Sequence, residues 1–84
     1  MNEAAPLRVL VVEDHGTLRA QIVALLRDAG HRVDEASDGR SGLRMAVEQP
    51  PDVLVLDLGL PGLDGVQLCR ALRESTPAHV PVLM

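Results

Sequence analysis

The feature that most constrains the fold is an uninterrupted run of four aliphatic residues, 53–56, that ends at an aspartate. The run reads Val-Leu-Val-Leu, and such a stretch is typical of a strand buried on both faces of a parallel sheet. Asp57 follows the run and opens a loop that contains glycine and proline residues. A carboxylate therefore stands where a buried strand is expected to reach the surface, and open α/β sheets bind their ligands at that edge.

A second, largely aliphatic run covers residues 7–12 and ends in the acidic pair Glu13 and Asp14. If the two strands are parallel neighbours, three carboxylates meet at one edge of the sheet. Carboxylates this close repel one another, so the site is expected to retain protons or to recruit a cation. Oxygen ligands favour Mg²⁺ or Mn²⁺ over zinc. The sequence therefore predicts a hard-cation site that includes Glu13, Asp14 and Asp57.

The first helix is predicted directly after the acidic pair. Five apolar residues recur with helical spacing and are expected to form the face that packs on the sheet: Leu18, Ile22, Leu25, Leu26 and Ala29. Gly30 is expected to end this helix, because glycine adopts a positive φ without steric strain.

The rest of the chain continues to alternate between strands and helices. The predicted strands cover residues 7–12, 33–36, 53–56 and 80–84. The second strand is polar enough to lie at an edge. Asp38 is predicted to cap a second helix that extends to about Glu48, and Asp64 a third that ends before Pro77. The order βαβαβαβ with short links predicts a parallel sheet with right-handed crossovers, within one domain that covers residues 1–84.

Composition and charge argue against several classes of protein, namely nucleic-acid-binding, secreted and membrane proteins. The chain has no Phe, Tyr or Trp, a net charge of −4, and scattered arginines, which together argue against nucleic-acid binding. We expect no signal peptide, and no apolar run approaches the ~20 residues that a membrane span needs. The single cysteine excludes an internal disulfide. A cytoplasmic protein that does not contact the membrane is expected.

The segments VLVVEDH and VLVLDLGLPGLDG resemble the receiver domain of bacterial two-component response regulators. In that family an acidic pair ends the first strand, and a phosphate-accepting aspartate ends the third and opens the loop D-x-x-x-P-x-x-D-G. Asp57, Pro61, Asp64 and Gly65 fill this pattern in register. The resemblance covers nearly the whole chain. It implies an α/β, flavodoxin-like, doubly wound parallel sheet of strand order 2-1-3-4, truncated before the family's fifth strand.

The resemblance also implies a function in two-component phosphorelay signal transduction. Asp57 would accept a phosphoryl group from a histidine-phosphate donor, so the partner would be a sensor histidine kinase or a phosphotransferase. Asp14, Asp57 and the backbone carbonyl of Gly59 would bind Mg²⁺ directly, and Glu13 would act through water. Such a domain is a signalling phosphoprotein and not an enzyme.

The chain departs from the family pattern after the fourth strand. The family binds the phosphoryl group with a Ser or Thr after strand four and a Lys after strand five, and this chain has neither position and no lysine. Without the family's final helix, the apolar faces of strands one and three are expected to be exposed, with residues 80–84 at an unprotected edge. We therefore expect a homodimer, a swapped oligomer or a fragment of a longer response regulator.

Two alternatives from other classes stay open. The first is a receiver-derived dimerisation or interaction module that works without phosphate. The second is a small phosphatase or phosphotransferase with Asp57 as nucleophile, similar to haloacid dehalogenases, but those enzymes need an aspartate where Gly59 stands. We expect Asp64 to be a helix cap and not a metal ligand. His15 either tunes the site or donates to phosphate, but we expect a solvent-facing histidine without a role.

Overall fold

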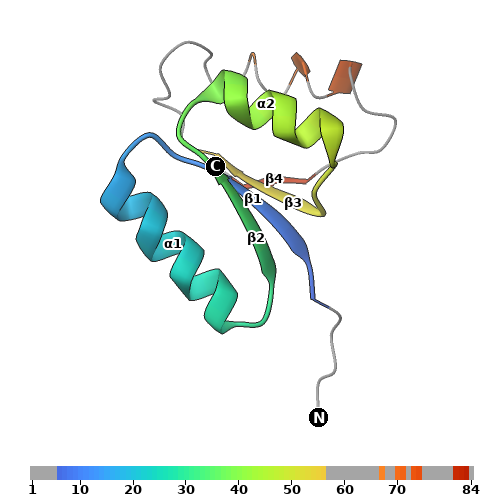
Figure 1. The fold of residues 1–84 in the computed structure, drawn as a ribbon. Helices are drawn as coiled ribbons and strands as arrows, with labels where there is room; N and C mark the ends of the chain where they lie inside the picture. Colours follow the sequence, from blue (N-terminus) through green and yellow to red (C-terminus); the bar gives the residue numbers. More distant parts are fainter. Residues whose placement is uncertain (1–5, 57–66, 68–69, 72, 75–80, 84) are drawn as a thin grey trace.

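The computed structural model describes residues 6–56, 67, 70, 71, 73, 74 and 81–83 of the 84-residue chain. Along the sequence these form β1 (Arg8–Val12), α1 (Gly16–Asp28), β2 (Arg32–Ala36), α2 (Gly39–Glu48), β3 (Val53–Leu56) and β4 (Val82–Leu83) (Figure 1). Residues 67, 70, 71, 73 and 74 are helical, in agreement with the predicted third helix. The predicted ends of that helix, Asp64 and Pro77, lie outside the described residues.

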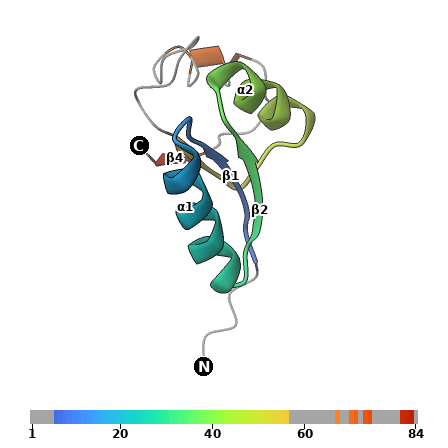
Figure 2. The same ribbon diagram turned by 60° about the vertical axis from the view of Figure 1, so that its left-hand side comes forward.

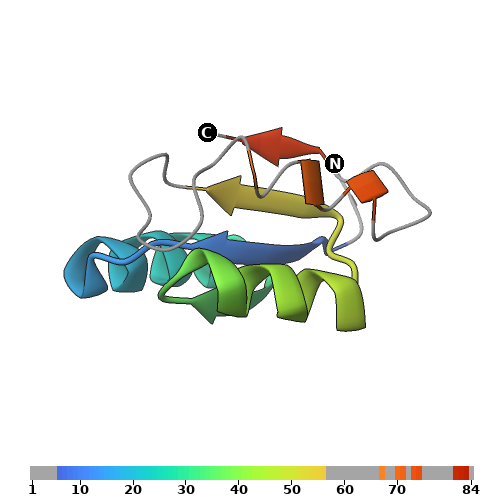
Figure 3. The ribbon, with the colours of Figure 1, turned by 90° about the horizontal axis from the view of Figure 1, so that it is seen from above.

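The four strands form one parallel sheet in the order β2-β1-β3-β4, as predicted (Figure 3). β2 lies at one edge, in agreement with its polar sequence. The register aligns Val12 of β1 with both Ala36 of β2 and Leu56 of β3. The C-terminal ends of these three strands therefore lie level with one another. The acidic residues are expected along this end of the sheet.

The two helices α1 and α2 cover opposite faces of the sheet (Figure 2). Alternate residues of β1 point to opposite sides. Leu10 and Val12 pack towards α2, where the buried helical residue is Ala46. Val9 and Val11 pack towards α1. The core is therefore two aliphatic layers that share the sheet, which is how a chain without aromatic residues fills its interior.

The face that α1 presents to the sheet differs from the predicted one. Val23, which was absent from the predicted set, is the buried residue of the helix, and Ile22 and Leu26 pack beside it. Leu18 is exposed, and Leu25 is 71% exposed. At about 100° of rotation per residue, the predicted face needed only a modest turn to place Val23 against the sheet. Apolar spacing alone could not specify this rotation, because Leu18 and Leu25 are equally apolar.

The ends of the helices follow the local signals in the sequence. Asp38 is the N-cap of α2, and one of its carboxylate oxygens accepts a hydrogen bond from the Ser41 backbone N–H at 2.8 Å. Gly30 follows α1 with a φ of 94°. Its N–H donates to the Arg27 carbonyl, and the next N–H, of His31, donates to the Leu26 carbonyl. This is the hydrogen-bond pattern of a glycine-terminated helix, so both predictions are confirmed.

The expected exposure of the sheet is only partly correct. The expectation for β1 is wrong, because α1 covers that strand and Val11 is fully buried. On the same face, Val53 and Val55 of β3 are half-buried, and Leu83 of β4 is 63% exposed. The exposed apolar surface of the sheet therefore lies over β3 and β4.

None of the helices that the structure describes combines the length and apolar character that crossing a membrane requires.

Candidate functional site

The acidic pair Glu13 and Asp14 follows directly after β1, at the edge where β1, β2 and β3 end. Asp57 is the next residue after β3, but Asp57 and Gly59 lie outside the described residues. The meeting of three carboxylates therefore stays a prediction. The condition on which it depends, that β1 and β3 are parallel neighbours with Val12 opposite Leu56, is met.

Glu13 is held on three sides. Its backbone N–H donates to the Ala36 carbonyl at 3.0 Å, and its own carbonyl accepts from Arg19 Nη1 at 2.9 Å. Its carboxylate Oε2 accepts from the His15 backbone N–H at 3.1 Å. The residue is only 6% exposed, which is rare for a glutamate and requires such hydrogen bonds. Glu13 is therefore a fixed, buried carboxylate at the end of β1.

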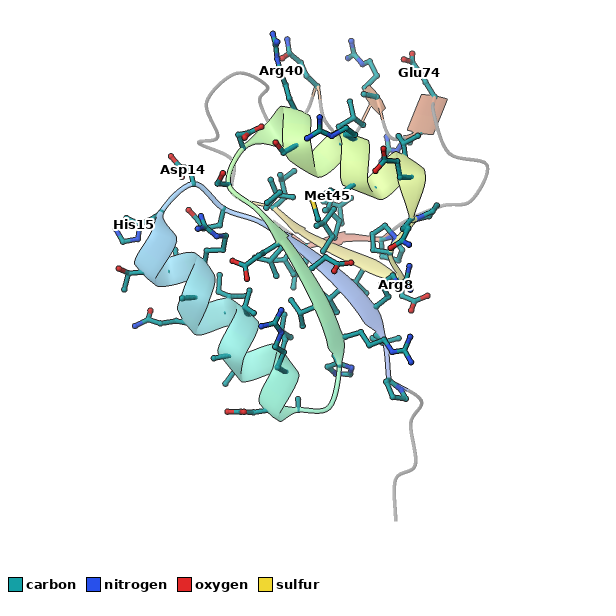
Figure 4. All side chains as sticks on the ribbon, viewed as in Figure 1. Arg8, Asp14, His15, Arg40, Met45 and Glu74 are labelled. Atoms are coloured by element: carbon teal, nitrogen blue, oxygen red, sulfur yellow. The ribbon has the colours of Figure 1, made fainter. Side chains whose placement is uncertain are left out.

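Asp14 differs from Glu13 although the two are adjacent in the sequence. Its side chain is exposed and lies on the loop between β1 and α1, where it points away from the body of the molecule (Figure 4). An exposed carboxylate on a constrained backbone can reach a hydrated cation, whereas a buried carboxylate has less access. The two acidic residues therefore differ in how far solvent and ions can reach their carboxylates.

His15 has a structural role that the sequence did not reveal. It is the N-cap of α1, and its Nδ1 accepts a hydrogen bond from the Leu18 backbone N–H at 3.2 Å (Figure 4). Histidine is not among the residues preferred at this position, so the usual capping signal was absent. The only signal was its place directly before the helix starts at Gly16. His15 is exposed, as expected of a solvent-facing histidine, but the expectation that it has no role is wrong.

Arg19 and Glu35 form an ion pair that sequence analysis also missed. Arg19 Nε and Glu35 Oε1 are 2.9 Å apart, and both side chains are partly exposed. The pair joins α1 to β2 beside the carbonyl of Glu13. No local pattern identifies such a pair, because its members are 16 residues apart and lie on different elements.

Asp38 lies two residues beyond the end of β2. The backbone N–H of Ser41 donates to its carboxylate and is the main cause of a pKa below the usual value of 3.8. The Ser41 hydroxyl, the Arg40 backbone and the charge of Arg44 lower this pKa further, and desolvation opposes them. Asp38 is therefore an ionised helix cap, and its oxygens are engaged with α2.

Within the described part of the chain, no group of three or more His, Cys, Asp and Glu residues could hold a metal ion. The predicted ligand set has only Glu13 and Asp14 inside that part, and both supply oxygen, as a Mg²⁺ site requires. A separate cavity of about 190 Å³ lies between β2 and α2, lined by Asp34, Met45, Glu48 and Gln49. It includes neither residue of the acidic pair.

The sequence profile of the response regulator receiver domain matches residues 9–84. The chain belongs to the response regulator receiver domain family. Receiver domains are signalling domains of two-component systems, so the predicted family and signalling class are confirmed.

The relatives of this receiver domain include full-length transcriptional regulators. The virulence transcriptional regulatory protein PhoP of Salmonella typhimurium strain LT2 is 45% identical over 78 residues, which are 93% of this chain and 34% of that protein. The transcriptional regulatory protein AfsQ1 of Streptomyces coelicolor is 38% identical over 76 residues, 90% of this chain and 33% of that protein. The chain thus spans about a third of the length of the curated relatives it matches.

Solved receiver domains share the fold. The chemotaxis response regulator CheY4 of Vibrio cholerae superimposes with a TM-score of 0.89 at 33% identity, covering 95% of this chain and 68% of that one. The receiver domain of the sensor histidine kinase PA1611 from Pseudomonas aeruginosa PAO1 has a TM-score of 0.86 at 35% identity, covering 93% and 65%. That structure contains a magnesium ion coordinated in the active site cleft. The likeness confirms the flavodoxin-like, doubly wound fold for this receiver domain.

Proposed function

We propose that this receiver domain accepts a phosphoryl group on Asp57 from a sensor histidine kinase or a phosphotransferase, with Mg²⁺, or alternatively Mn²⁺, as cofactor. The observation that carries the proposal is the parallel pairing of β1 with β3, in which Val12 lies opposite Leu56. Glu13 and Asp57 are the next residues along these two strands. Residues that follow paired parallel strands start from the same edge of the sheet.

The metal would be held by oxygen atoms of this chain. Asp14, Asp57 and the Gly59 carbonyl are the proposed direct ligands, and Glu13 acts through water. The exposure of Asp14 and the burial of Glu13 support this division. Mg²⁺ commonly keeps several of its waters and uses one or two carboxylates together with phosphate oxygens. The magnesium ion in the PA1611 receiver domain also supports the choice of metal.

In the proposed reaction, a carboxylate oxygen of Asp57 attacks the phosphorus of a phosphohistidine. The new P–O bond forms as the P–N bond breaks, and the histidine nitrogen of the donor leaves with the electron pair. The product is an acyl phosphate on Asp57. When bound, the metal neutralises charge on the moving phosphoryl group. This chain would fix the carboxylates in place, and the hydrogen bonds made by the N–H, the carbonyl and the carboxylate of Glu13 serve that purpose.

Intact mass spectrometry after incubation with a small phosphodonor such as acetyl phosphate tests the proposal. We expect a gain of one phosphoryl group that requires Mg²⁺ and is absent in Asp57→Asn. Asp52→Asn is the matched control, because Asp52 precedes β3 and accepts from the Arg8 N–H at the opposite edge of the sheet. No gain in the unaltered chain, or an equal gain in Asp57→Asn, would contradict the proposal.

The proposal also covers where this chain is located in the cell and whether its partners are proteins or nucleic acids. We place the chain, residues 1–84 as one partial receiver domain, in the cytoplasm, in keeping with its single cysteine. The net charge of −4 supports protein partners and not nucleic acid for this segment.

A second function, self-association, is favoured by the exposed face of the sheet. Val53, Val55 and Leu83 point to the same side as Val9 and Val11, because the strands are paired in register. α1 buries the two residues of β1 and leaves those of β3 and β4 half-buried or exposed. We propose that two copies associate through this strip, as a dimer or by exchanging elements, whether or not Asp57 is phosphorylated.

A further inference from the structure

Arg19 joins three elements through one guanidinium group. It stands at the end of the first turn of α1, donates from Nε to Glu35 Oε1 on β2 at 2.9 Å, and donates from Nη1 to the carbonyl of Glu13 at 2.9 Å. A guanidinium is planar with donors in fixed directions, so one bond orients the other. The carboxylate of Glu35 therefore sets the direction from which Arg19 approaches Glu13.

The bond to Glu13 has a consequence for Asp14. The carbonyl of Glu13 and the N–H of Asp14 belong to one planar peptide group, so fixing the carbonyl fixes the direction in which the chain continues. On the other side of the residue, the Glu13 N–H is held by the Ala36 carbonyl at 3.0 Å. Both peptide groups of Glu13 are thus tied to β2, one directly and the other through Arg19.

We propose that Arg19, oriented by Glu35, is a positioning residue for the acidic pair. Arg19 holds Glu13 and Asp14 in the arrangement that binds Mg²⁺. The role deepens the proposed function and depends on it, because it concerns the same edge of the sheet. Neither Arg19 nor Glu35 touches the metal in this proposal. They act through the backbone of Glu13.

Whether replacing Arg19 strengthens or weakens Mg²⁺ binding distinguishes a positioning role from a purely electrostatic one. A positive charge beside a cation site weakens cation binding by Coulomb repulsion. If Arg19 acted only as a charge, Arg19→Met would tighten Mg²⁺ binding and Arg19→Lys would leave it unchanged. If Arg19 positions the peptide, both variants weaken binding. Methionine has no hydrogen-bond donor, and the single nitrogen of lysine does not reproduce two donors that are fixed in one plane.

The chain contains a matched control in Arg27. This residue also lies on α1 and also donates to a carbonyl of β2, from Nη2 to Val33 at 3.0 Å. It is two helical turns beyond Arg19 and, among the residues that the structure describes, makes no hydrogen bond to the loop that follows β1. Arg27→Met therefore removes the same kind of contact between α1 and β2, and the same charge, at a greater distance from the acidic pair.

Titration calorimetry with Mg²⁺, repeated with Mn²⁺, measures the expected effect on the full 84-residue chain. We expect Arg19→Met and Arg19→Lys to weaken binding about tenfold, the loss typical when a group that orients a metal ligand is removed. Arg27→Met should bind as the unaltered chain does. Glu35→Ala should weaken binding in the chain that keeps Arg19 and have little further effect in Arg19→Met. Tighter or unchanged binding in Arg19→Met would overturn the proposal.

Amide hydrogen exchange without metal tests the same role independently of Mg²⁺. The His15 N–H donates to the Glu13 carboxylate, so its exchange rate reports whether Glu13 is held. We expect about tenfold faster exchange at His15 in Arg19→Met, comparable to the loss of one charge-assisted hydrogen bond, and no change in Arg27→Met. Unchanged exchange at His15 would overturn the positioning role. Absence of Mg²⁺ binding in the unaltered chain would instead contradict the proposed function.

Discussion

Gly42 of α2 packs against Val12, the last residue of β1, with no space for a side chain between them. A Cβ atom on Gly42 would lie 2.6 Å from Cγ2 and 3.0 Å from Cγ1 of Val12. Val12 is fully buried and directly precedes Glu13. The absence of a side chain at Gly42 therefore sets how closely α2 approaches the strand that leads into the acidic pair.

Gly42→Ala is expected to destabilise the fold by about 1–3 kcal/mol, the usual range for overpacking a core. In an open helix the same change would stabilise by about 1 kcal/mol, because alanine is the better helix former. Urea unfolding followed by far-ultraviolet circular dichroism measures the difference, since the chain has no aromatic residue for fluorescence. Gly16→Ala is the control, because its Cβ would meet only Arg19 Nη2 at 3.9 Å. Equal effects of the two substitutions would refute the packing explanation.

Because Asp38 caps α2 in its ionised form, we expect the free energy of unfolding to depend on pH in the acidic range. Its pKa is lowered in the folded chain, chiefly by the Ser41 N–H, so its stabilising effect is complete above the usual pKa of 3.8 and is lost as the pH falls through the lower folded value. Asp38→Asn keeps a capping oxygen but does not titrate. The stability advantage of the unaltered chain over Asp38→Asn should therefore be constant at higher pH and shrink as the pH falls through 3.8 and below. Urea unfolding at each pH measures it, and a constant difference would contradict the assignment.

His15→Ala is expected to destabilise α1 by about 1 kcal/mol, because the Leu18 N–H loses its acceptor. His15→Asn should restore the loss, since asparagine is among the best capping residues. Urea unfolding at neutral pH without metal separates this effect from any change in cation binding. If His15→Ala and His15→Asn were equally stable, the hydrogen bond from Leu18 would not act as a cap.

Self-association is expected to depend on the exposed strip over β3 and β4. Leu83→Glu places a charge on this strip and should shift the chain towards monomer in sedimentation velocity at micromolar concentration. Leu25→Glu is the matched control, because it also changes an exposed leucine, but on α1. A monomeric unaltered chain, or equal effects of the two substitutions, would contradict association through the strip.

Local sequence determined the order of the described elements and two of the helix ends. The run at residues 53–56, the capping aspartate Asp38 and the terminating Gly30 each act within a few residues of themselves, so their structures could be predicted without knowing the fold. The spacing of the acidic pair and Asp57 carried the resemblance to receiver domains. With that resemblance came the strand order, which depends on contacts too distant along the chain for periodicity to specify.

Tertiary structure alone decided the details that support the site. The rotation that buries Val23 in place of Leu25, the fit of Gly42 against Val12 and the bridge from Arg19 to Glu35 join residues on different elements. Such contacts depend on how each helix is rotated and how closely it lies on the sheet, and the packing of all side chains sets both together. Sequence by itself therefore determined which residues stand at the sheet edge, and the packed fold decided what holds Glu13 there.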